Sequence, residues 1–242
     1  MFKISLHLTV YRYEAIVALI ILLLTGSIIV SSKDDERSFP PPQRYPYQIA
    51  LTFDDGPHPH FTESIISILR AEDVKATFFL VGTKMTEHPS LAARLAVEHH
   101  ELAGHTFSHR NLSKLSREDI RRELQVTKQL IVDLARQDSM FFRPPGGQYD
   151  RDVLSVAEEM GLSMVLWTVF PKDHEEKSAD KIVEKVLAQA TDRGVVLLHS
   201  GRPATLQALP KIIRELKRRG YRFSTISQLY QSSKRKQLAW LK

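Results

Sequence analysis

The sequence predicts an α/β fold in which helices cover a parallel sheet. From residue 47 onward, short apolar runs alternate with longer amphipathic stretches, which is typical of βαβ units. Polar residues repeatedly follow the apolar runs, as expected where the strands of such a sheet end. At 242 residues, the chain has room for one large domain behind a leader segment. The alternation leaves two architectures open, a barrel of fewer than eight units and an open doubly wound sheet.

The predicted strands are seven short apolar runs. They cover residues 48–53, 76–81, 101–104, 140–143, 163–169, 194–199 and 221–225. About seven parallel strands in one domain are too few for a complete eight-unit barrel. No internal repeat and no second set of apolar runs points to another domain.

The predicted helices lie between these runs. They cover residues 61–72, 89–99, 116–136, 151–160, 179–191 and 204–219. Ser116 precedes an acidic first turn and Pro89 opens another helix, both of which are helix-start signals. Gly161, Gly194 and Gly220 follow helical stretches as stop signals. Each helix therefore connects two strands in the manner of a βαβ unit.

The first 46 residues predict a membrane anchor and a linker. After a short segment, 1–14, residues 15–32 contain no charge and are almost wholly apolar. As a helix, these 18 residues would span about 27 Å, close to the hydrocarbon thickness of a bilayer. No clear Ala-x-Ala site follows, so an uncleaved signal anchor is favoured over a cleaved signal peptide. Residues 33–46 are proline-rich and predict a spacer. The domain is then expected outside the cytoplasm, membrane-anchored, or secreted if the leader is cleaved.

Composition places limits on partners and chemistry. The net charge of +6 comes from the C-terminal part, where residues 217–242 are basic without an acidic residue. We interpret 231–242 as a solvated basic tail that follows a single, monomeric domain at 47–230. Without an interleaved aromatic platform or a known reader motif, nucleic acid is not an expected partner. The absence of cysteine excludes disulfides and thiolate metal ligands.

Two histidines and two adjacent carboxylates predict a metal site. His105 and His109 lie in Gly-His-Thr-Phe-Ser-His, and Asp54 and Asp55 follow a predicted strand. Imidazole and carboxylate ligands suit zinc, and three protein ligands leave a position for water. One turn of helix at 105–109 would place both imidazoles on the same side. The alternative is that the histidines pack locally and that Asp-Asp-Gly-Pro forms only a turn.

Further polar residues fall at the ends of other predicted strands. Arg143 ends the fourth, Asp173 follows the fifth and His199 ends the sixth. A parallel barrel gathers the carboxyl ends of its strands into one mouth. Packing alone does not explain polar residues at so many strand ends, so we expect a common site.

Five short motifs carry a family resemblance. They are Thr52–Gly56, His105–His109, Arg143–Gly147, Trp167–Asp173 and Leu197–His199. In order and spacing they resemble the motifs of the polysaccharide deacetylases, carbohydrate esterase family four. The resemblance covers about residues 47 to 230 and implies a distorted, incomplete (β/α) barrel, similar to a TIM barrel.

The resemblance also implies a role for each matching residue. Asp55, His105 and His109 correspond to the metal ligands and Asp54 to the general base. Arg143 corresponds to the arginine that holds the base, His199 to the general acid and Asp173 to its carboxylate partner. The implied substrate-binding residues are Pro145, Gly146, Gly147, Trp167, His174 and Leu197, of which Leu197 would line the acetyl pocket.

Three positions depart from the family pattern. His174 stands where a tryptophan often follows the fifth-strand aspartate, and Gly146 replaces an aromatic residue. Ser200 replaces an aspartate that often follows the last histidine. Glycine can still supply a backbone N–H, so these changes predict an altered groove more than a lost reaction.

The implied activity is hydrolysis of N-acetyl groups on a glycan outside the cytoplasm. The expected cofactor is Zn²⁺, with Co²⁺, Ni²⁺ or Mn²⁺ as alternatives. The expected substrate is an N-acetylated polysaccharide, with peptidoglycan before chitin-like polymers of N-acetylglucosamine. Other functions open to this fold are glycan binding without catalysis, O-acetyl ester hydrolysis and hydrolysis of a small-molecule amide.

Overall fold

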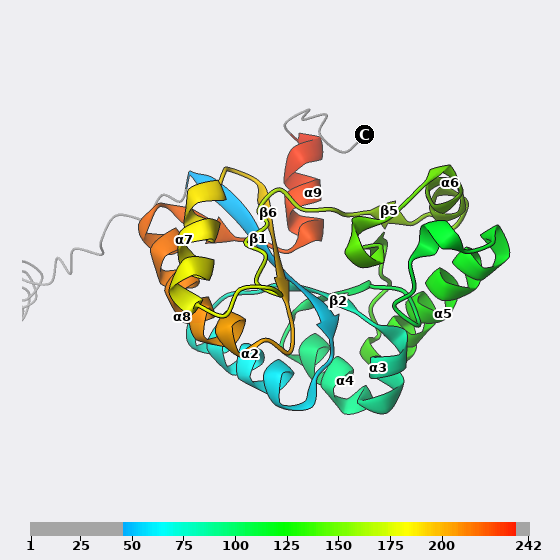
Figure 1. The fold of residues 1–242 in the computed structure, drawn as a ribbon, viewed down its shortest axis with the longest axis horizontal. Coiled ribbons are helices and arrows are strands. Elements are labelled where there is room, and N and C mark those ends of the chain that lie inside the picture. The colour runs from blue at the N-terminus through cyan, green and yellow to red at the C-terminus, as the bar shows by residue number, and fades with distance from the viewer. Residues whose placement is uncertain (1–45, 236–242) are drawn as a thin grey trace, which may run out of the picture. The chain divides into compact units, whose positions relative to one another are not determined.

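The fold is a curled half-barrel of parallel strands wrapped by helices (Figure 1). The computed structural model describes residues 46–235. In this part of the chain seven strands form one sheet in the order β5-β4-β3-β2-β1-β6, and β7 also pairs with β1. Their bounds are β1 Tyr47–Gly56, β2 Thr77–Leu80, β3 Glu101–Gly104, β4 Phe141–Phe142, β5 Ser163–Met164, β6 Gly194–His199 and β7 Tyr221–Phe223. The predicted parallel α/β fold and its incomplete barrel are confirmed, and the open doubly wound sheet is not found.

All six predicted helices are present in the described part. They are α2 Pro59–Ala71, α4 Pro89–Val97, α5 Arg117–Ala135, α6 Arg151–Glu159, α7 Ala179–Gln189 and α8 Pro203–Arg218. Side-chain caps start several of them, since the N–H of Asp119 donates to Ser116 and that of Lys181 to Ser178. Two helices were missed, α3 (Gly82–Glu87) and α9 (Ile226–Arg235), and α9 continues past residue 230.

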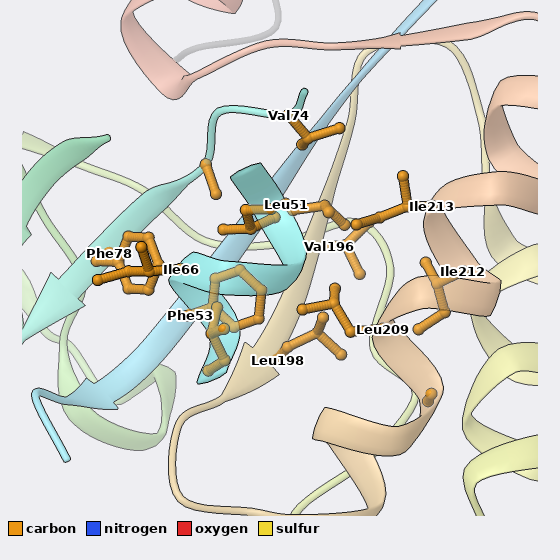
Figure 2. Close-up of a cluster of buried hydrophobic side chains, with 14 of the residues drawn as sticks. Leu51, Phe53, Ile66, Val74, Phe78, Val196, Leu198, Leu209, Ile212 and Ile213 are labelled. Carbon is orange, nitrogen blue, oxygen red and sulfur yellow. The ribbon is translucent and has the colours of Figure 1, made fainter. Parts of the chain in front are cut away.

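Strand β1 positions the site because its side chains alternate between two buried layers. Leu51 and Phe53 point to the main core, which Val196, Leu198 and the helix α8 residues Leu209, Ile212 and Ile213 complete (Figure 2). Ala50 belongs instead to the cluster inside the barrel. Since side chains alternate along a strand, Thr52 and Asp54 share the inner face with Ala50. The same alternation on β6 places Leu197 and His199 on that face.

A segment after β5 closes part of the barrel. The sequence predicts a strand over 163–169, but β5 ends at Met164. The N–H of Val165 still donates to Phe142 in β4 at 2.9 Å, whereas Val169 forms a single parallel bridge to Val196 in β6. Residues 165–169 therefore cross from one edge of the sheet to the other and cannot keep a continuous ladder with either.

The predicted leader lies outside the described residues. This applies to the anchor at 15–32 and to nearly all of the linker at 33–46. Within 46–235, none of the helices combines the length and the apolar character needed to span a bilayer.

Candidate active site

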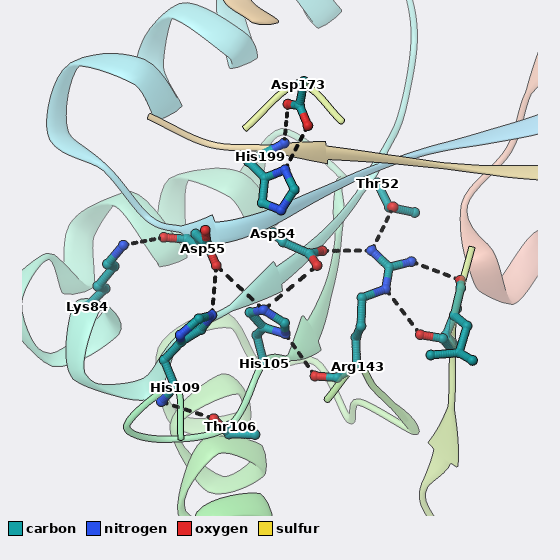
Figure 3. A network of polar contacts seen from close by, with 12 residues as sticks. Thr52, Asp54, Asp55, Lys84, His105, Thr106, His109, Arg143, Asp173 and His199 are labelled. Carbon is teal, nitrogen blue, oxygen red and sulfur yellow. Dashed lines mark hydrogen bonds and ion pairs between the residues drawn. The ribbon is translucent and has the colours of Figure 1, made fainter. Parts of the chain in front are cut away.

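A buried arginine holds the first carboxylate at the end of β1. The guanidinium of Arg143 is fully buried, and its Nη1 donates to Asp54 Oδ1 at 2.6 Å and to Thr52 Oγ1 at 2.9 Å (Figure 3). Its other nitrogens donate to the carbonyls of Val165 and Leu166, both at 3.1 Å. Bonds to several partners fix both the arginine and the direction of the Asp54 carboxylate.

The histidine motif is a loop and not a helix. The expectation of a helical turn at 105–109 is wrong, because Thr106 and His109 have left-handed backbones with φ of 63° and 58°. Amide groups of Gly82 and Thr83 donate to carbonyls in this loop, and Ser108 donates to the buried Glu123 carboxylate. The left-handed residues fold the loop so that the rings of His105 and His109 lie 5.0 Å apart.

Contacts from neighbouring segments accompany the left-handed backbone of this loop and of Asp55. Asp55 has φ 68°, a conformation that non-glycine residues rarely adopt. The ammonium of Lys84 donates to its carbonyl at 2.7 Å. At Gly82, a Cβ would lie 2.4 Å from the ring of Phe107, so only glycine lets the histidine loop pack this closely.

Asp55, His105 and His109 form a set suited to a divalent metal. One ligand atom from each lies within 4.8 Å of the others, and Asp55 Oδ1 is 3.0 Å from His109 Nε2 and 3.5 Å from His105 Nε2. Ligands about 2.0–2.2 Å from a tetrahedral zinc lie roughly 3.3 Å from one another. The Nδ1 of His105 lies 2.8 Å from the carbonyl of Arg143, to which it donates, so Nε2 keeps its lone pair for an ion. The residues present therefore fit a metal site.

The same contacts set the charge of Asp55. Burial raises the pKa of this carboxyl, but hydrogen bonds and charge interactions with His105 and His109 lower it well below its ordinary value. Asp55 is therefore a carboxylate near neutral pH, as a metal ligand has to be.

A second histidine–carboxylate pair lies on the opposite side of Asp54. Nδ1 of His199 lies 2.7 Å from Asp173 Oδ1, and the backbone N–H of His199 donates to Asp173 Oδ2 at 2.8 Å. Thr205 donates a further bond to Asp173 Oδ2 at 2.6 Å. Burial lowers the pKa of His199, but Asp173, followed by Asp54 and Asp55, raises it above its ordinary value. Since Asp54 and His199 are register partners on β1 and β6, the two groups face the same space.

The motifs and the fold have counterparts among known proteins. Residues 43–165 match the family model described as polysaccharide deacetylase. The chain belongs to this family.

The similar family members include enzymes and a pseudoenzyme. The chain is 39% identical over 77% of its length to a peptidoglycan-N-acetylglucosamine deacetylase of Bacillus cereus, of which it covers 70%. It is 38% identical over 74% of its length to a chitooligosaccharide deacetylase of Rhizobium leguminosarum bv. trifolii, of which it covers 90%. The structure of BA3943, a CE4 family pseudoenzyme from Bacillus anthracis, is similar with a TM-score of 0.73 and 30% identity, over 76% of this chain and 65% of that one.

Two glycines shape the wall next to the deacetylase motif residue Arg143. Pro145–Gly147 form a short 3₁₀ turn, in which Gly146 and Gly147 have left-handed φ of 62° and 67°. A Cβ at Gly147 would lie 2.8 Å from the indole of Trp167, so the half-buried Trp167 packs directly on this turn. Within the described chain, the N–H of Gly147 is bonded to Pro144, whereas that of Gly146 donates no hydrogen bond. Gly146 is thus the residue of this turn with an N–H available to a ligand.

His174, at the position where deacetylases often carry tryptophan, extends an aromatic row toward His199. Its ring stacks on Phe170 with 5.6 Å between centroids and lies 4.9 Å from the ring of His199. Phe170 in turn lies 5.3 Å from Trp167. The departure from the family pattern therefore leaves an aromatic surface beside the site, although with a smaller ring. Leu197 lies on the inner side of the site. It is buried, is paired in register with Thr52 and points into the barrel.

The structure brings the predicted catalytic and metal residues together and adds four others. Thr52, Lys84 and Thr205 form hydrogen bonds with predicted site residues, and Glu123 bonds to Ser108 in the histidine loop. Thr52 begins the motif Thr52–Gly56, but the other three come from helices α3, α5 and α8. Their sequences carry no motif, so only the fold could reveal them.

Proposed function

We propose that this protein is a zinc-dependent hydrolase that removes N-acetyl groups from N-acetylglucosamine residues of a glycan, with peptidoglycan as substrate. The observation that carries the proposal is the meeting of three groups at one end of the half-barrel. These are the Asp55, His105 and His109 set, the Arg143-bound Asp54, and the Asp173-bound His199. The relatives named for deacetylation of peptidoglycan and chitooligosaccharides support it.

Asp55, His105 and His109 would hold the metal. When bound, a zinc ion lowers the pKa of a coordinated water and polarises a carbonyl oxygen. Asp54 lies beside this set, with its Oδ2 3.7 Å from His105 Nε2. Its other oxygen is bonded to Arg143, so Oδ2 is the atom in position to accept a proton from the attacking water.

The leaving amine requires a proton, and His199 is the group that can donate it. With Nδ1–H bonded to Asp173, the Nε2 of His199 faces the space shared with Asp54 (Figure 3). The raised pKa of His199 keeps a fraction of the imidazole charged near neutral pH. As the acetamide carbon becomes tetrahedral, the free N–H of Gly146 can bind the negative oxygen. Asp54 begins ionised and His199 begins protonated, so activity should show a bell-shaped pH dependence.

The proposal includes a location. A charge-free stretch at residues 15–32 is long enough for a membrane anchor. We infer that the anchor holds the domain outside the cytoplasm, where peptidoglycan is found. Protease accessibility of the domain in intact cells and in permeabilised cells tests this orientation, and protection in intact cells would contradict it.

Acetate release tests the activity directly. The purified protein should release acetate from N-acetylglucosamine oligomers and from peptidoglycan, more with added zinc than after chelation. Asp54→Ala should abolish release while the protein keeps its bound zinc, and His105→Ala should lose the zinc. Unchanged metal content in His105→Ala would show that the ligand set is wrong.

A second candidate function is glycan binding without catalysis. It is motivated by the similarity to a protein named a pseudoenzyme and by His174, Gly146 and Ser200 at positions where the family pattern differs. The two functions separate in one experiment. Acetate release from no glycan by protein with one bound zinc would favour the binding protein.

A further inference from the structure

The metal-binding side of the site carries a cation without an ionic partner. Lys84 on α3 is half-buried, and its Nζ donates to the carbonyl of Asp55 at 2.7 Å and lies 3.0 Å from His58 Nε2. Figure 3 shows Lys84 beside Asp55, on the side away from Arg143. Arg143 is neutralised by its ion pair with Asp54. Within residues 46–231, Lys84 makes no ion pair with any carboxylate, so its charge is not neutralised in the same way.

The carboxylates nearest to Lys84, those of Asp55 and Glu87, interact with its charge but make no ion pair with it. The Asp55 carboxylate is directed to His105 and His109. Burial lowers the pKa of His58, and the charge of Lys84 lowers it further, so His58 is neutral near pH 7. A neutral His58 accepts one ammonium proton and Asp55 accepts a second. An ammonium group has three donors, so one N–H of Lys84 is left for another acceptor.

A second cation, Arg202, lies near Lys84, after the end of strand β6. Arg202 follows β6 by three residues and is exposed. In the described chain its side chain makes neither a hydrogen bond nor an ion pair. It lies close enough to His58 and Lys84 for its charge to lower the pKa of both. The ring of His58 packs on Gly201, where a Cβ would lie 2.8 Å from Nε2. Ser200, at a position where the family often has aspartate, adds no negative charge to the segment before Arg202.

We propose that Lys84 and Arg202 form a binding site for a carboxylate on the sugar next to the one that is deacetylated. The inference rests on the proposed function and sharpens its substrate class. Peptidoglycan carries such carboxylates on its attached peptides and, where a peptide has been removed, on the lactyl ether of alternate sugars, whereas chitin is neutral. The cationic edge therefore selects an acidic glycan over a neutral one of the same length. Because Arg202 is exposed and screened by water, its share of the affinity is modest, about two- to fivefold.

Arg202→Gln is the variant that tests the site. It removes the charge from an exposed side chain without a contact to the predicted catalytic residues. Three glycans of equal length are compared: a chitooligosaccharide, a peptidoglycan fragment freed of peptides, and the same fragment with peptides. KM should rise about two- to fivefold for the acidic glycans and stay unchanged for the chitooligosaccharide. The lactyl carboxyl is an amide where a peptide is attached, so a rise with only the peptide-free fragment assigns the lactyl carboxylate and a rise with only the peptide-bearing one assigns a peptide carboxylate. A rise with both shows that the site accepts either.

Control measurements separate this site from general charge effects. Arg222→Gln removes the same charge from an exposed residue of β7, which pairs with the beginning of β1, at the opposite end from Asp54. It should change KM for none of the glycans, and the KM difference caused by Arg202→Gln should shrink in high salt. An equal KM for wild type and Arg202→Gln on the acidic glycans, or an equal rise on all three glycans, would overturn the proposal.

Binding distinguishes failure of this site from failure of the proposed function. If wild type releases acetate from no glycan, the proposed hydrolysis is wrong. Calorimetric titration of Asp54→Asn with the peptide-free fragment still measures the carboxylate site, since this protein need not react. Weaker binding after Arg202→Gln in the Asp54→Asn protein supports the site, and equal binding contradicts it.

Discussion

The site contains two histidine–carboxylate groups that are chemically alike and differently built. On one side, His105 donates its Nδ1–H to a backbone carbonyl, and its Nε2 faces the carboxylate of Asp55. On the other, His199 donates its Nδ1–H to the carboxylate of Asp173. A carbonyl partner leaves a neutral imidazole with a free lone pair, whereas a carboxylate partner favours the imidazolium. The partner of Nδ1 therefore separates the proposed metal ligands, here called the metal side, from the proposed acid, here called the acid side.

The backbones of the two groups differ in the same sense. Asp55, Thr106 and His109 on the metal side all have left-handed φ angles. His199 ends the regular strand β6, and Asp173 receives bonds from it and from Thr205. On the metal side two proposed ligands, Asp55 and His109, are themselves left-handed, whereas on the acid side the left-handed residue is Lys172, next to Asp173, and His199 keeps strand geometry.

Replacing the two neighbouring aspartates should have the largest effects and separate their roles. Asp54→Asn should lower kcat by about 10²- to 10⁴-fold, because it removes a general base, and should leave zinc content unchanged. Asp55→Asn should lose zinc as well as activity. Acetate release and metal analysis on the same preparations measure both. Loss of zinc in Asp54→Asn would show that Asp54 is itself a ligand.

Removing His105 or His109 should weaken zinc binding by more than about 100-fold. Loss of a residue that only supports a ligand typically weakens it by about 10- to 100-fold. The two should differ in stability. His105→Ala leaves the buried carbonyl of Arg143 without its donor and should lower the free energy of unfolding of the metal-free protein by about 1–3 kcal/mol. His109 has a side chain 45% exposed, so His109→Ala should cost less than about 0.5 kcal/mol. Competition with a zinc chelator and denaturant unfolding measure the two quantities. Equal stability losses would contradict the comparison.

Replacing Asp173 should convert the acid side toward the character of the metal side. The carboxylate raises the pKa of His199, so in Asp173→Asn that pKa falls and the alkaline limb of the kcat profile moves to lower pH. Activity near neutral pH should drop by up to about 10²-fold, part of the contribution of a general acid. An unshifted alkaline limb would exclude His199 as the group that titrates there.

The same pair should leave a signature in stability. A raised pKa stabilises the fold below the unfolded histidine value of 6.5 and loses this contribution as pH rises through the folded value. The stability difference between wild type and Asp173→Asn, both without metal, should therefore be largest in mild acid and shrink above neutral pH. Urea unfolding across this range measures it.

The smallest effect on kcat is expected at Thr205, which contacts Asp173 and not His199. Thr205→Val removes one of three bonds to Asp173 and should cost about 1.5 kcal/mol of unfolding free energy. His199 keeps both of its bonds to Asp173, so kcat should fall less than about threefold, well within the contribution of the whole acid. A loss as large as that of Asp173→Asn would mean that Thr205 sets the position of the carboxylate by itself.

Strand ends were the part of the site that the sequence could predict. Period-two alternation and the parallel arrangement place Asp54 and His199 on the inner face, because these rules act over a few residues. The histidine loop was predicted as a helical turn, because a spacing of i and i+4 between two histidines fits a helical turn as well as it fits a loop. What decides its shape is the packing of Phe107 on Gly82 and the bond to Glu123, contacts between distant segments.

Short elements set the other limit of prediction. The run 163–169 looked like one strand because it is mostly apolar, yet it pairs first with β4 and then with β6. Local sequence does not say which partner each residue finds. Helix α3 has six residues, and a periodic pattern is hard to detect over so short a length.

The crossing of residues 165–169 gives Arg143 a second structural role. Its guanidinium binds carbonyls of this segment and, at the same time, Asp54 on β1. One cation thus fastens the edge of the barrel and orients Asp54, the proposed base. If the crossing segment moves outward, the base loses its orientation while the helices and the core around Phe53 stay packed. Displacement of this segment alone would therefore stop the proposed reaction without unfolding the protein, and activity would report whether the barrel is closed.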